Sequence, residues 1–253
     1  MTDAPYLSIR NLSNAYVTRP FGLFGKKEVK PVLNNVDLEI SQGEIFGLVG
    51  ESGCGKTTLA KCILGLIDYE GEIIVNGRKR GKKPTPRERR ESAFEVQAVF
   101  QNPGASLNPV KSVGWILEEP LRVHGLPSVH GGQGSAAERQ KRVDEMLDMV
   151  GLDASHKKRK PRELSSGQKQ RVAIAAALML KPGLIVADEP VSALDVSVAA
   201  QILNLFRDLN KRLGLSLLFI SHNMEVVNYL CDRVAVMQNG KLYYSDKYCI
   251  DIL

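Results

Sequence analysis

The segment GESGCGKTT, residues 50–58, limits the possible folds of this chain more than any other feature. It combines three glycines with a lysine and two threonines. The preceding stretch, 44–50, is apolar on both faces, which predicts a buried parallel strand. The following stretch, 57–66, places apolar residues at helical spacing. The sequence therefore predicts a strand, a tight loop and a helix in succession, which is typical of an α/β fold.

A loop of this kind is suited to binding phosphate groups. Glycines let backbone N–H groups approach oxygen anions, and the helix N-terminus adds the positive end of its dipole. Lys56 supplies a positive charge for the β- and γ-phosphates, and the Thr57 hydroxyl is a ligand for Mg²⁺. The predicted phosphate-binding residues are Gly50, Glu51, Ser52, Gly53, Cys54, Gly55, Lys56, Thr57 and Thr58.

Two later segments end in polar side chains. The apolar run 184–187 is followed by Asp188 and Glu189. Within the segment 216–224, an apolar strand is predicted that ends in the polar residue His222. Ligands bind at the carboxyl edge of strands in open α/β sheets. We therefore expect Asp188 to hold Mg²⁺ through water and Glu189 to polarise an attacking water. We expect His222 to stabilise charge on a γ-phosphate.

A helix is predicted within residues 162–178, where Ser165 and Ser166 can cap the N-terminus. The start of this helix offers a second set of polar donors for a phosphate. The sequence leaves open whether that phosphate is bound in the same molecule.

The composition is that of a soluble globular protein, with 253 residues, of which 25% are charged and 43% hydrophobic. A membrane-spanning helix needs about 18 consecutive apolar residues, and no apolar stretch is that long. No secretory signal is visible at the N-terminus. Four cysteines without a CxxC pair are typical of a reducing cytoplasm. Cys54 lies in the phosphate loop, where thiols are often reactive, so we expect modest sensitivity of turnover to thiol reagents.

The net charge of +6 arises partly from two basic runs, residues 78–90 and 156–162. Such runs occur in proteins that bind nucleic acid or anionic lipid. Neither run contains aromatic residues, so we expect solvated loops and no nucleic-acid partner.

The order of these segments, over about residues 7–245, resembles the nucleotide-binding subunits of ABC transporters. LSSGQKQR (164–171) precedes ADEPVSALD (187–195), and the pair Ser221–His222 follows. The phosphate loop alone is shared by many NTPases, whereas this combination is specific to the superfamily. The resemblance implies ATP and Mg²⁺ as cofactors and ATP hydrolysis as the activity.

The resemblance also implies roles for other residues. Gln101, in VFQNP, matches the glutamine that contacts Mg²⁺ and the attacking water and senses the membrane subunit. Residues 164–168 match the signature segment, which faces the γ-phosphate bound by the other subunit of a head-to-tail dimer. Residues 192–195 match the D-loop across that dimer, and Tyr16 matches the aromatic residue that stacks on adenine.

The implied sites can be stated together. The catalytic residues are Glu189, His222, Lys56 and Gln101. The metal ligands are Thr57, Gln101 and Asp188. Tyr16 and the signature residues Ser165, Ser166, Gly167 and Gln168 join the loop in binding nucleotide.

Three further segments resemble the peptide and nickel importer ATPases: FQNPGASLNP (100–109), the run from 189 to 206, and the insertion FGLFGKK (21–27). This resemblance implies a second ABC ATPase subunit as partner, in a hetero- or homodimer, and transmembrane permease subunits. It also implies an extracytoplasmic solute-binding protein as an indirect partner. The implied location is peripheral, at the cytoplasmic face of the membrane. One departure is Ser166, which stands where the signature usually has its first glycine. The added side chain predicts weakened but not abolished turnover.

We expect a single domain, residues 1–253, with a P-loop NTPase core and a mostly parallel sheet. The core and an antiparallel β subdomain, the latter formed by about 5–45 and 70–80, occupy about 5–101 and 169–245. A helical subdomain occupies about 103–168, with a glycine-rich loop at 127–138.

Two alternative functions remain. The first is a soluble ABC ATPase that acts in enzyme assembly or on nucleic acid, which the basic runs favour slightly. The second is a non-hydrolysing regulatory subunit, which would need a damaged Glu189 or His222, and both residues are present.

Overall fold

The computed structural model describes four stretches of the chain: residues 4–18, 28–82, 84–125 and 135–245. The insertion 21–27 and Cys249 lie outside the described residues. The chain forms two compact units. The first unit comprises residues 1–89 and 216–253, and the second comprises residues 90–215.

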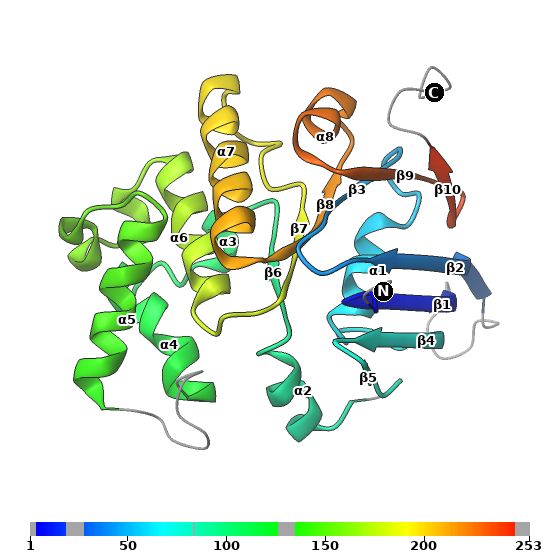
Figure 1. Cartoon of the computed structure of the whole chain (residues 1–253), viewed down its shortest axis with the longest axis horizontal. Coiled ribbons are helices and arrows are strands. Elements are labelled where there is room, and N and C mark those ends of the chain that lie inside the picture. The colour runs from blue at the N-terminus through cyan, green and yellow to red at the C-terminus, as the bar shows by residue number, and fades with distance from the viewer. Residues whose placement is uncertain (1–3, 19–27, 83, 126–134, 246–253) are drawn as a thin grey trace. The chain divides into compact units, whose positions relative to one another are not determined.

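The first unit contains an antiparallel sheet with strand order β2-β1-β4-β5 (Figure 1). Leu7 at the start of β1 lies opposite Ile40 of β2 and Val75 of β4. All three side chains are fully buried, so the sheet has an apolar face. This sheet confirms the antiparallel region predicted from the sequence. Its strands are β1 (Leu7–Thr18), β2 (Glu28–Ile40), β4 (Glu70–Val75) and β5 (Arg78–Lys79).

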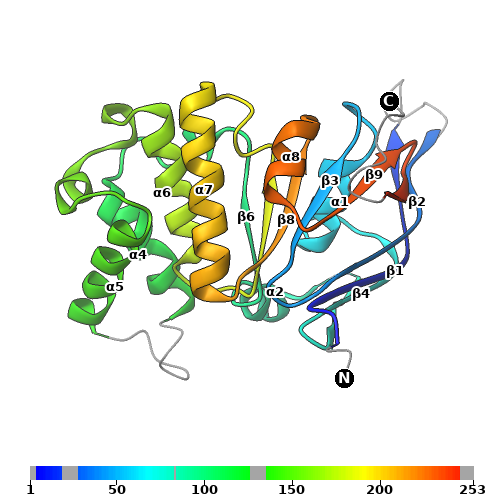
Figure 2. The same cartoon turned by 45° about the horizontal axis from the view of Figure 1, so that its top comes forward.

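The first unit also contains parallel strands (Figure 2). Strand β3 (Ile45–Val49) pairs in parallel with β8 (Ser216–Ser221) and with β9 (Arg233–Gln238). Strand β10 (Lys241–Ser245) pairs antiparallel with β9. Every residue of β3 and of β8 is buried, which explains why both segments are apolar on both faces. Helix α1 (Lys56–Ile63) follows β3, and α8 (Met224–Leu230) follows β8.

The second unit is mainly helical and contains one parallel strand pair, β6 (Val96–Val99) with β7 (Leu184–Asp188). Along the sequence, the division between the two units falls after Arg89, within helix α2 (Pro86–Ser92). The helices of the second unit are α3 (Pro103–Ser106), α4 (Val113–His124), α5 (Ala136–Met149), α6 (Ser166–Leu178) and α7 (Val196–Leu213). Two short 3₁₀ helices, η2 (Ala154–Lys158) and η3 (Pro161–Glu163), precede α6.

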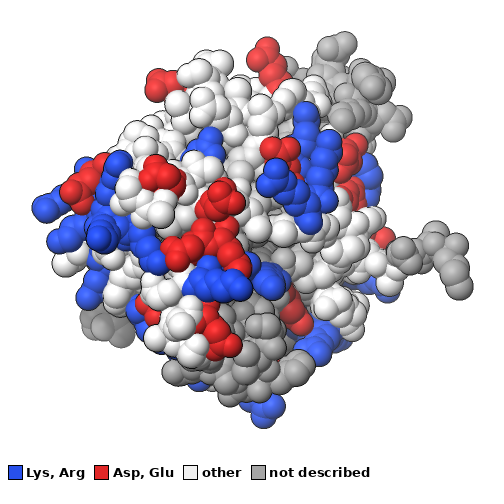
Figure 3. Space-filling view, turned by 60° about the vertical axis from the view of Figure 1, so that its left-hand side comes forward, with Lys and Arg blue, Asp and Glu red and all other residues white. Residues whose placement is uncertain are grey.

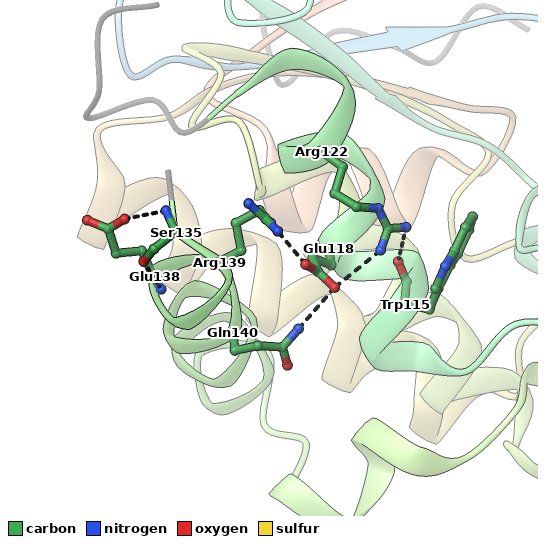
Figure 4. A network of polar contacts seen from close by, with 7 residues as sticks. All are labelled: Trp115, Glu118, Arg122, Ser135, Glu138, Arg139 and Gln140. Atoms are coloured by element: carbon green, nitrogen blue, oxygen red, sulfur yellow. Dashed lines mark hydrogen bonds and ion pairs between the residues drawn. The ribbon is translucent and has the colours of Figure 1, made fainter. Parts of the chain in front are cut away.

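Helices α4 and α5 are joined by a polar network around Glu118 (Figure 4). The Glu118 carboxylate accepts hydrogen bonds from Arg122 Nη1 at 3.2 Å, Arg139 Nε at 2.9 Å and Gln140 Nε2 at 3.0 Å. The side chains of Glu118 and Arg139 are only 13% and 15% exposed. The Arg122 guanidinium also lies 4.4 Å from the centre of the Trp115 ring. Charged groups thus tie two helices together in a largely buried position.

The glycine-rich loop predicted at 127–138 ends earlier than expected. Helix α5 begins at Ala136, after a capping box in which Ser135 Oγ accepts from the Glu138 amide at 3.2 Å. Glu138 in turn accepts from the Ser135 amide at 2.6 Å. Three residues of the predicted loop are therefore helical, because a Ser-x-x-Glu pattern follows the glycines. Residues 126–134 lie outside the described part of the chain.

The expected solvated loops are found only in part. The first basic run is largely exposed, whereas the second is mostly buried or half-buried, and neither is a simple loop. The first run includes β5 and the beginning of α2, and the second overlaps η2 and η3. Lys79 pairs with Glu72 at 2.5 Å, and Lys157 pairs with Asp144 at 2.6 Å. On the face drawn in Figure 3, basic side chains lie beside acidic ones.

Within the described residues, no helix combines the length and apolar character that crossing a membrane requires.

Candidate functional site

The loop after β3 is closed by the side chain of Lys56. Its Nζ donates hydrogen bonds to the carbonyl oxygens of Gly50 at 2.6 Å and Glu51 at 2.8 Å, and it lies 3.8 Å from Cys54 Sγ. Lys56 is only 7% exposed, and the two carbonyls offset part of the cost of burying its charge. A positive charge is therefore held in place inside the loop.

Two positions in the loop require glycine for different reasons. A Cβ at Gly50 would lie 2.3 Å from the carbonyl oxygen of Met237, so no side chain fits there. Gly53 adopts a φ of 82°, in the left-handed region that favours glycine. Helix α1 begins at Lys56, within the segment 50–58, with Thr57 exposed in its first turn and Thr58 buried. The predicted strand, loop and helix are confirmed.

The register of the parallel strands brings His222 to the same sheet edge as the loop. Val49 at the end of β3 lies opposite Ser221 at the end of β8. Gly50 and His222 are the next residues of the two chain segments, so both leave the sheet at one edge. His222 is exposed, and Asn223 after it caps α8 by accepting a hydrogen bond from the Val226 amide.

Tyr16 lies in β1 of the first unit, opposite Lys30 of β2. Its side chain is 41% exposed and thus accessible to a ligand. Its stacking on adenine stays a prediction.

The second unit also has polar residues at the ends of two paired parallel strands. Val99 at the end of β6 lies opposite Ala187 near the end of β7. Gln101 is exposed two residues after Val99, and Glu189 is half-buried two residues after Ala187. Asp188 ends β7 and is only 7% exposed. The amide of Gln101 and the two carboxylates are therefore placed at one edge of this strand pair.

Glu189 has an unusual backbone that the sequence did not reveal. Its φ is 53°, in the left-handed region, which is uncommon for glutamate. Its carbonyl oxygen accepts hydrogen bonds from the Ser192 amide at 3.3 Å and from Ser192 Oγ at 3.1 Å, which hold the turn. Sparsely populated backbone conformations of this kind cluster at functional sites.

The signature segment begins α6 with a capping box. Ser165 Oγ accepts from the Gln168 amide at 3.2 Å, and the Ser165 amide donates to Gln168 Oε1 at 3.0 Å. Ser166 is the first helical residue and is exposed. Gly167 is buried, and a Cβ there would lie 2.6 Å from Val198 Cγ1 in α7. The predicted cap at Ser165 is confirmed.

His156 makes a contact that the sequence did not indicate, since it stands there only as part of a basic run. His156 is 6% exposed, and its Nε2 lies 3.2 Å from Nε2 of Gln168. No sequence pattern indicates this contact, because the two residues are twelve positions apart and lie in different helices, His156 in η2 and Gln168 in α6.

Comparisons with known proteins show the family of this chain. The ABC transporter family model matches residues 33–192. A protein of Brucella ovis named as a peptide import ATP-binding protein is 45% identical over 243 residues, covering 96% of this chain and 72% of the relative. The dipeptide transport ATP-binding protein DppF of Lactococcus lactis is 47% identical over 222 residues, covering 86% of this chain and 69% of the relative.

Solved structures show the same fold. The dimeric ATP-binding cassette MJ0796, in a post-hydrolysis state bound to ADP and Pi, matches with a TM-score of 0.80 and 30% identity, over 95% of this chain and 97% of that one. CbiO1 of Clostridium perfringens, part of the CbiONQ transporter complex, matches with a TM-score of 0.79 and 25% identity, over 95% and 88%. The chain therefore belongs to the ABC transporter family, and it is an ATP-hydrolysing subunit of that family.

Proposed function

We propose that this chain binds and hydrolyses ATP to drive an ABC importer of peptides or of a related small solute such as nickel. The observation that carries the proposal is the buried Lys56 ammonium, which the loop 50–58 holds in place. The relatives named above for peptide import and dipeptide transport support the substrate class.

The nucleotide is bound by the first unit in this proposal. Backbone N–H groups of residues 50–58 and the N-terminus of α1 contact the phosphates. Lys56 exchanges carbonyl contacts for the β- and γ-phosphate oxygens, and Tyr16 stacks on adenine.

Magnesium would be held by Thr57, Asp188 and Gln101. Their hydroxyl, carboxylate and amide oxygens are the hard donors that this ion prefers. When bound, the ion neutralises charge on the phosphate oxygens.

Hydrolysis depends on positioning and on charge. Glu189 orients the attacking water, and its half-buried side chain at the end of β7 supports that role. Lys56 and His222 stabilise the charge that spreads over the γ-phosphate oxygens, while Gln101 contacts the water.

A second ABC ATPase subunit forms a hetero- or homodimer with this chain. Residues 165–168 contact the nucleotide bound by the partner, and residues 192–195 form the contact between the two sites. The division into a core, about 5–101 and 169–245, and a helical subdomain, about 103–168, belongs to the same proposal. Transmembrane permease subunits receive the motion, and an extracytoplasmic solute-binding protein delivers the solute. The chain works at the cytoplasmic face of the membrane.

The hydrolysis step is tested with Glu189→Gln. This change keeps the shape of the side chain but removes the base, so turnover should fall by about 100-fold or more while ATP binding persists. Glu225→Gln, on the exposed first turn of α8, is the matched control and should leave turnover unchanged. Equal turnover in Glu189→Gln and the unmodified protein would contradict the assignment.

The transport step is tested by affinity purification of the tagged chain from native membranes in mild detergent. We expect two permease subunits and a second, related ATPase to be recovered with the chain. Reconstitution of the whole complex in liposomes should give ATP-dependent peptide uptake. Recovery of soluble enzymes or nucleic acid alone would favour a soluble ABC ATPase and contradict the importer.

A further inference from the structure

We propose that His156 is a positioning residue for the signature segment, because it holds the side chain of Gln168 through a hydrogen bond from Gln168 Nε2 to His156 Nε2. The proposal rests on the function proposed above for residues 165–168. All of the residues involved belong to the second unit.

The orientation of the Gln168 amide follows from its capping contact. Gln168 Oε1 accepts a hydrogen bond from the Ser165 backbone amide at 3.0 Å. A backbone N–H can only donate, so the oxygen of the Gln168 amide must face Ser165. The NH₂ group of Gln168 therefore faces His156 Nε2 at 3.2 Å. Since an NH₂ group can only donate, His156 Nε2 must carry no proton and act as the acceptor.

The other ring nitrogen of His156 has the complementary surroundings. Nδ1 lies 3.1 Å from the Asp153 carboxylate and 3.2 Å from the Asp153 carbonyl oxygen, and both are acceptors. Hydrogen bonds from Ser155 to the Asp153 side chain lower the pKa of that carboxyl, so it stays ionised. The proton of neutral His156 is therefore expected on Nδ1. Asp153 selects the tautomer whose Nε2 can accept from Gln168.

The segment that carries His156 is anchored to α4. The Val113 amide donates to the Arg159 carbonyl oxygen at 2.8 Å. Gly114 approaches Lys157 so closely that a Cβ would lie 2.8 Å from Lys157 Cγ. His156 itself is 6% exposed. The imidazole is thus a fixed support, and contacts run from α4 through His156 to the start of α6.

The signature segment gains a defined geometry from this support. Ser165 Oγ accepts a hydrogen bond from the Gln168 backbone amide. The amides of Ser166 and Gly167, in the first turn of α6, have no carbonyl partner within the helix. These are the donors that a γ-phosphate from the partner subunit would use. Loss of the Gln168–His156 contact would free the Gln168 side chain, loosen the capping box and misdirect these donors.

Two variants of His156 test the proposal. His156→Met fills a similar space without a strong acceptor, so kcat for ATP should fall by about 5- to 10-fold, with the Kd for ATP nearly unchanged. His156→Gln can place its amide oxygen near the position of Nε2, so it should recover kcat to within about 2-fold of the unmodified protein. A residue that only fills space would show the reverse order, because Met is the better apolar filler.

Two structural readouts do not depend on turnover. In ¹⁵N-histidine NMR of the full chain, His156 should show the Nδ1–H tautomer, with its resonances assigned by their loss in His156→Gln. The amides of Ser165 and Gln168 should exchange hydrogen faster in His156→Met than in His156→Gln. An Nε2–H tautomer, or equal exchange in both variants, would overturn the proposal.

The outcomes separate this proposal from the proposed function. If the unmodified chain with its partner subunits does not hydrolyse ATP, the proposed function fails, whereas the tautomer and exchange results still decide the contact. If it hydrolyses ATP and His156→Met has normal kcat, the role of His156 is overturned and the function stands.

Discussion

Lys56 Nζ lies 2.6 Å from the carbonyl oxygen of Gly50, six residues earlier in the chain. This contact joins the end of β3 to the start of α1 across the loop. Gly50 in turn approaches Met237 so closely that no side chain fits between them. Lys56 therefore closes the loop and also carries the charge proposed to bind phosphate, so its replacement affects both.

Lys56→Met removes the charge but keeps much of the length of the side chain. We expect ATP hydrolysis to fall by about 100-fold or more, because the charge stabilises the reacting phosphate. We expect ATP binding to weaken as well, as measured by titration with a fluorescent ATP analogue. The control is Lys61→Met, in the last turn of the same helix. Equal losses in both variants would show that the effect is not specific to the loop.

Cys54 should account for any sensitivity of turnover to thiol reagents. Cys62 and Cys231 are each only 1% exposed, and burial raises the pKa of the Cys62 thiol to about 12. Cys54 is half-buried within the loop and lies next to Lys56. In a protein carrying Cys249→Ser, maleimide should lower the ATPase rate modestly, and bound ATP should slow the reaction. Adding Cys54→Ser should remove the sensitivity. Unchanged turnover after complete alkylation of Cys54, checked by mass spectrometry, would contradict this prediction.

Ser166→Gly should raise the ATPase rate of the assembled transporter. The Ser166 side chain is exposed at the first helical residue of α6, where it would crowd a phosphate that approaches the backbone amides. The cost to helix stability should be small, about 0.5 kcal/mol. Ser165→Ala is the contrasting variant, since loss of the cap should cost about 1 kcal/mol and lower the rate. An unchanged or lower rate in Ser166→Gly would argue against crowding by Ser166.

Glu118→Gln should destabilise the helical second unit by about 2 kcal/mol, because two arginines lose their shared carboxylate. Urea unfolding followed by Trp115 fluorescence measures this change, since Trp115 is the only tryptophan in the chain and contacts Arg122. Glu119→Gln, on the exposed side of α4, should leave the transition midpoint unchanged. Equal midpoints in the two variants would show that the Glu118 network adds little to stability.

Local patterns carried most of the fold prediction. The apolar stretches at 45–49 and 216–221 form buried parallel strands, and Ser165 caps α6. The predicted loop at 127–138 was wrong at its end. The prediction followed the glycine-rich composition, whereas the Ser-x-x-Glu pattern at 135–138 starts helix α5 at Ala136.

The sequence by itself determined the strand–loop–helix at residues 44–66, the two carboxylates at the end of the apolar run 184–187 and the family resemblance. These features depend on the order of near neighbours along the chain, which sets local hydrogen bonding and burial.

Only the tertiary structure decided the register that pairs Val49 with Ser221, the left-handed backbone of Glu189 and the contact of His156 with Gln168. Strand register depends on the packing of segments far apart in the chain. A strained dihedral angle persists only where the surrounding structure over-determines it. The hydrogen bond between the buried His156 and the half-buried Gln168 likewise forms only after packing has brought the two side chains together.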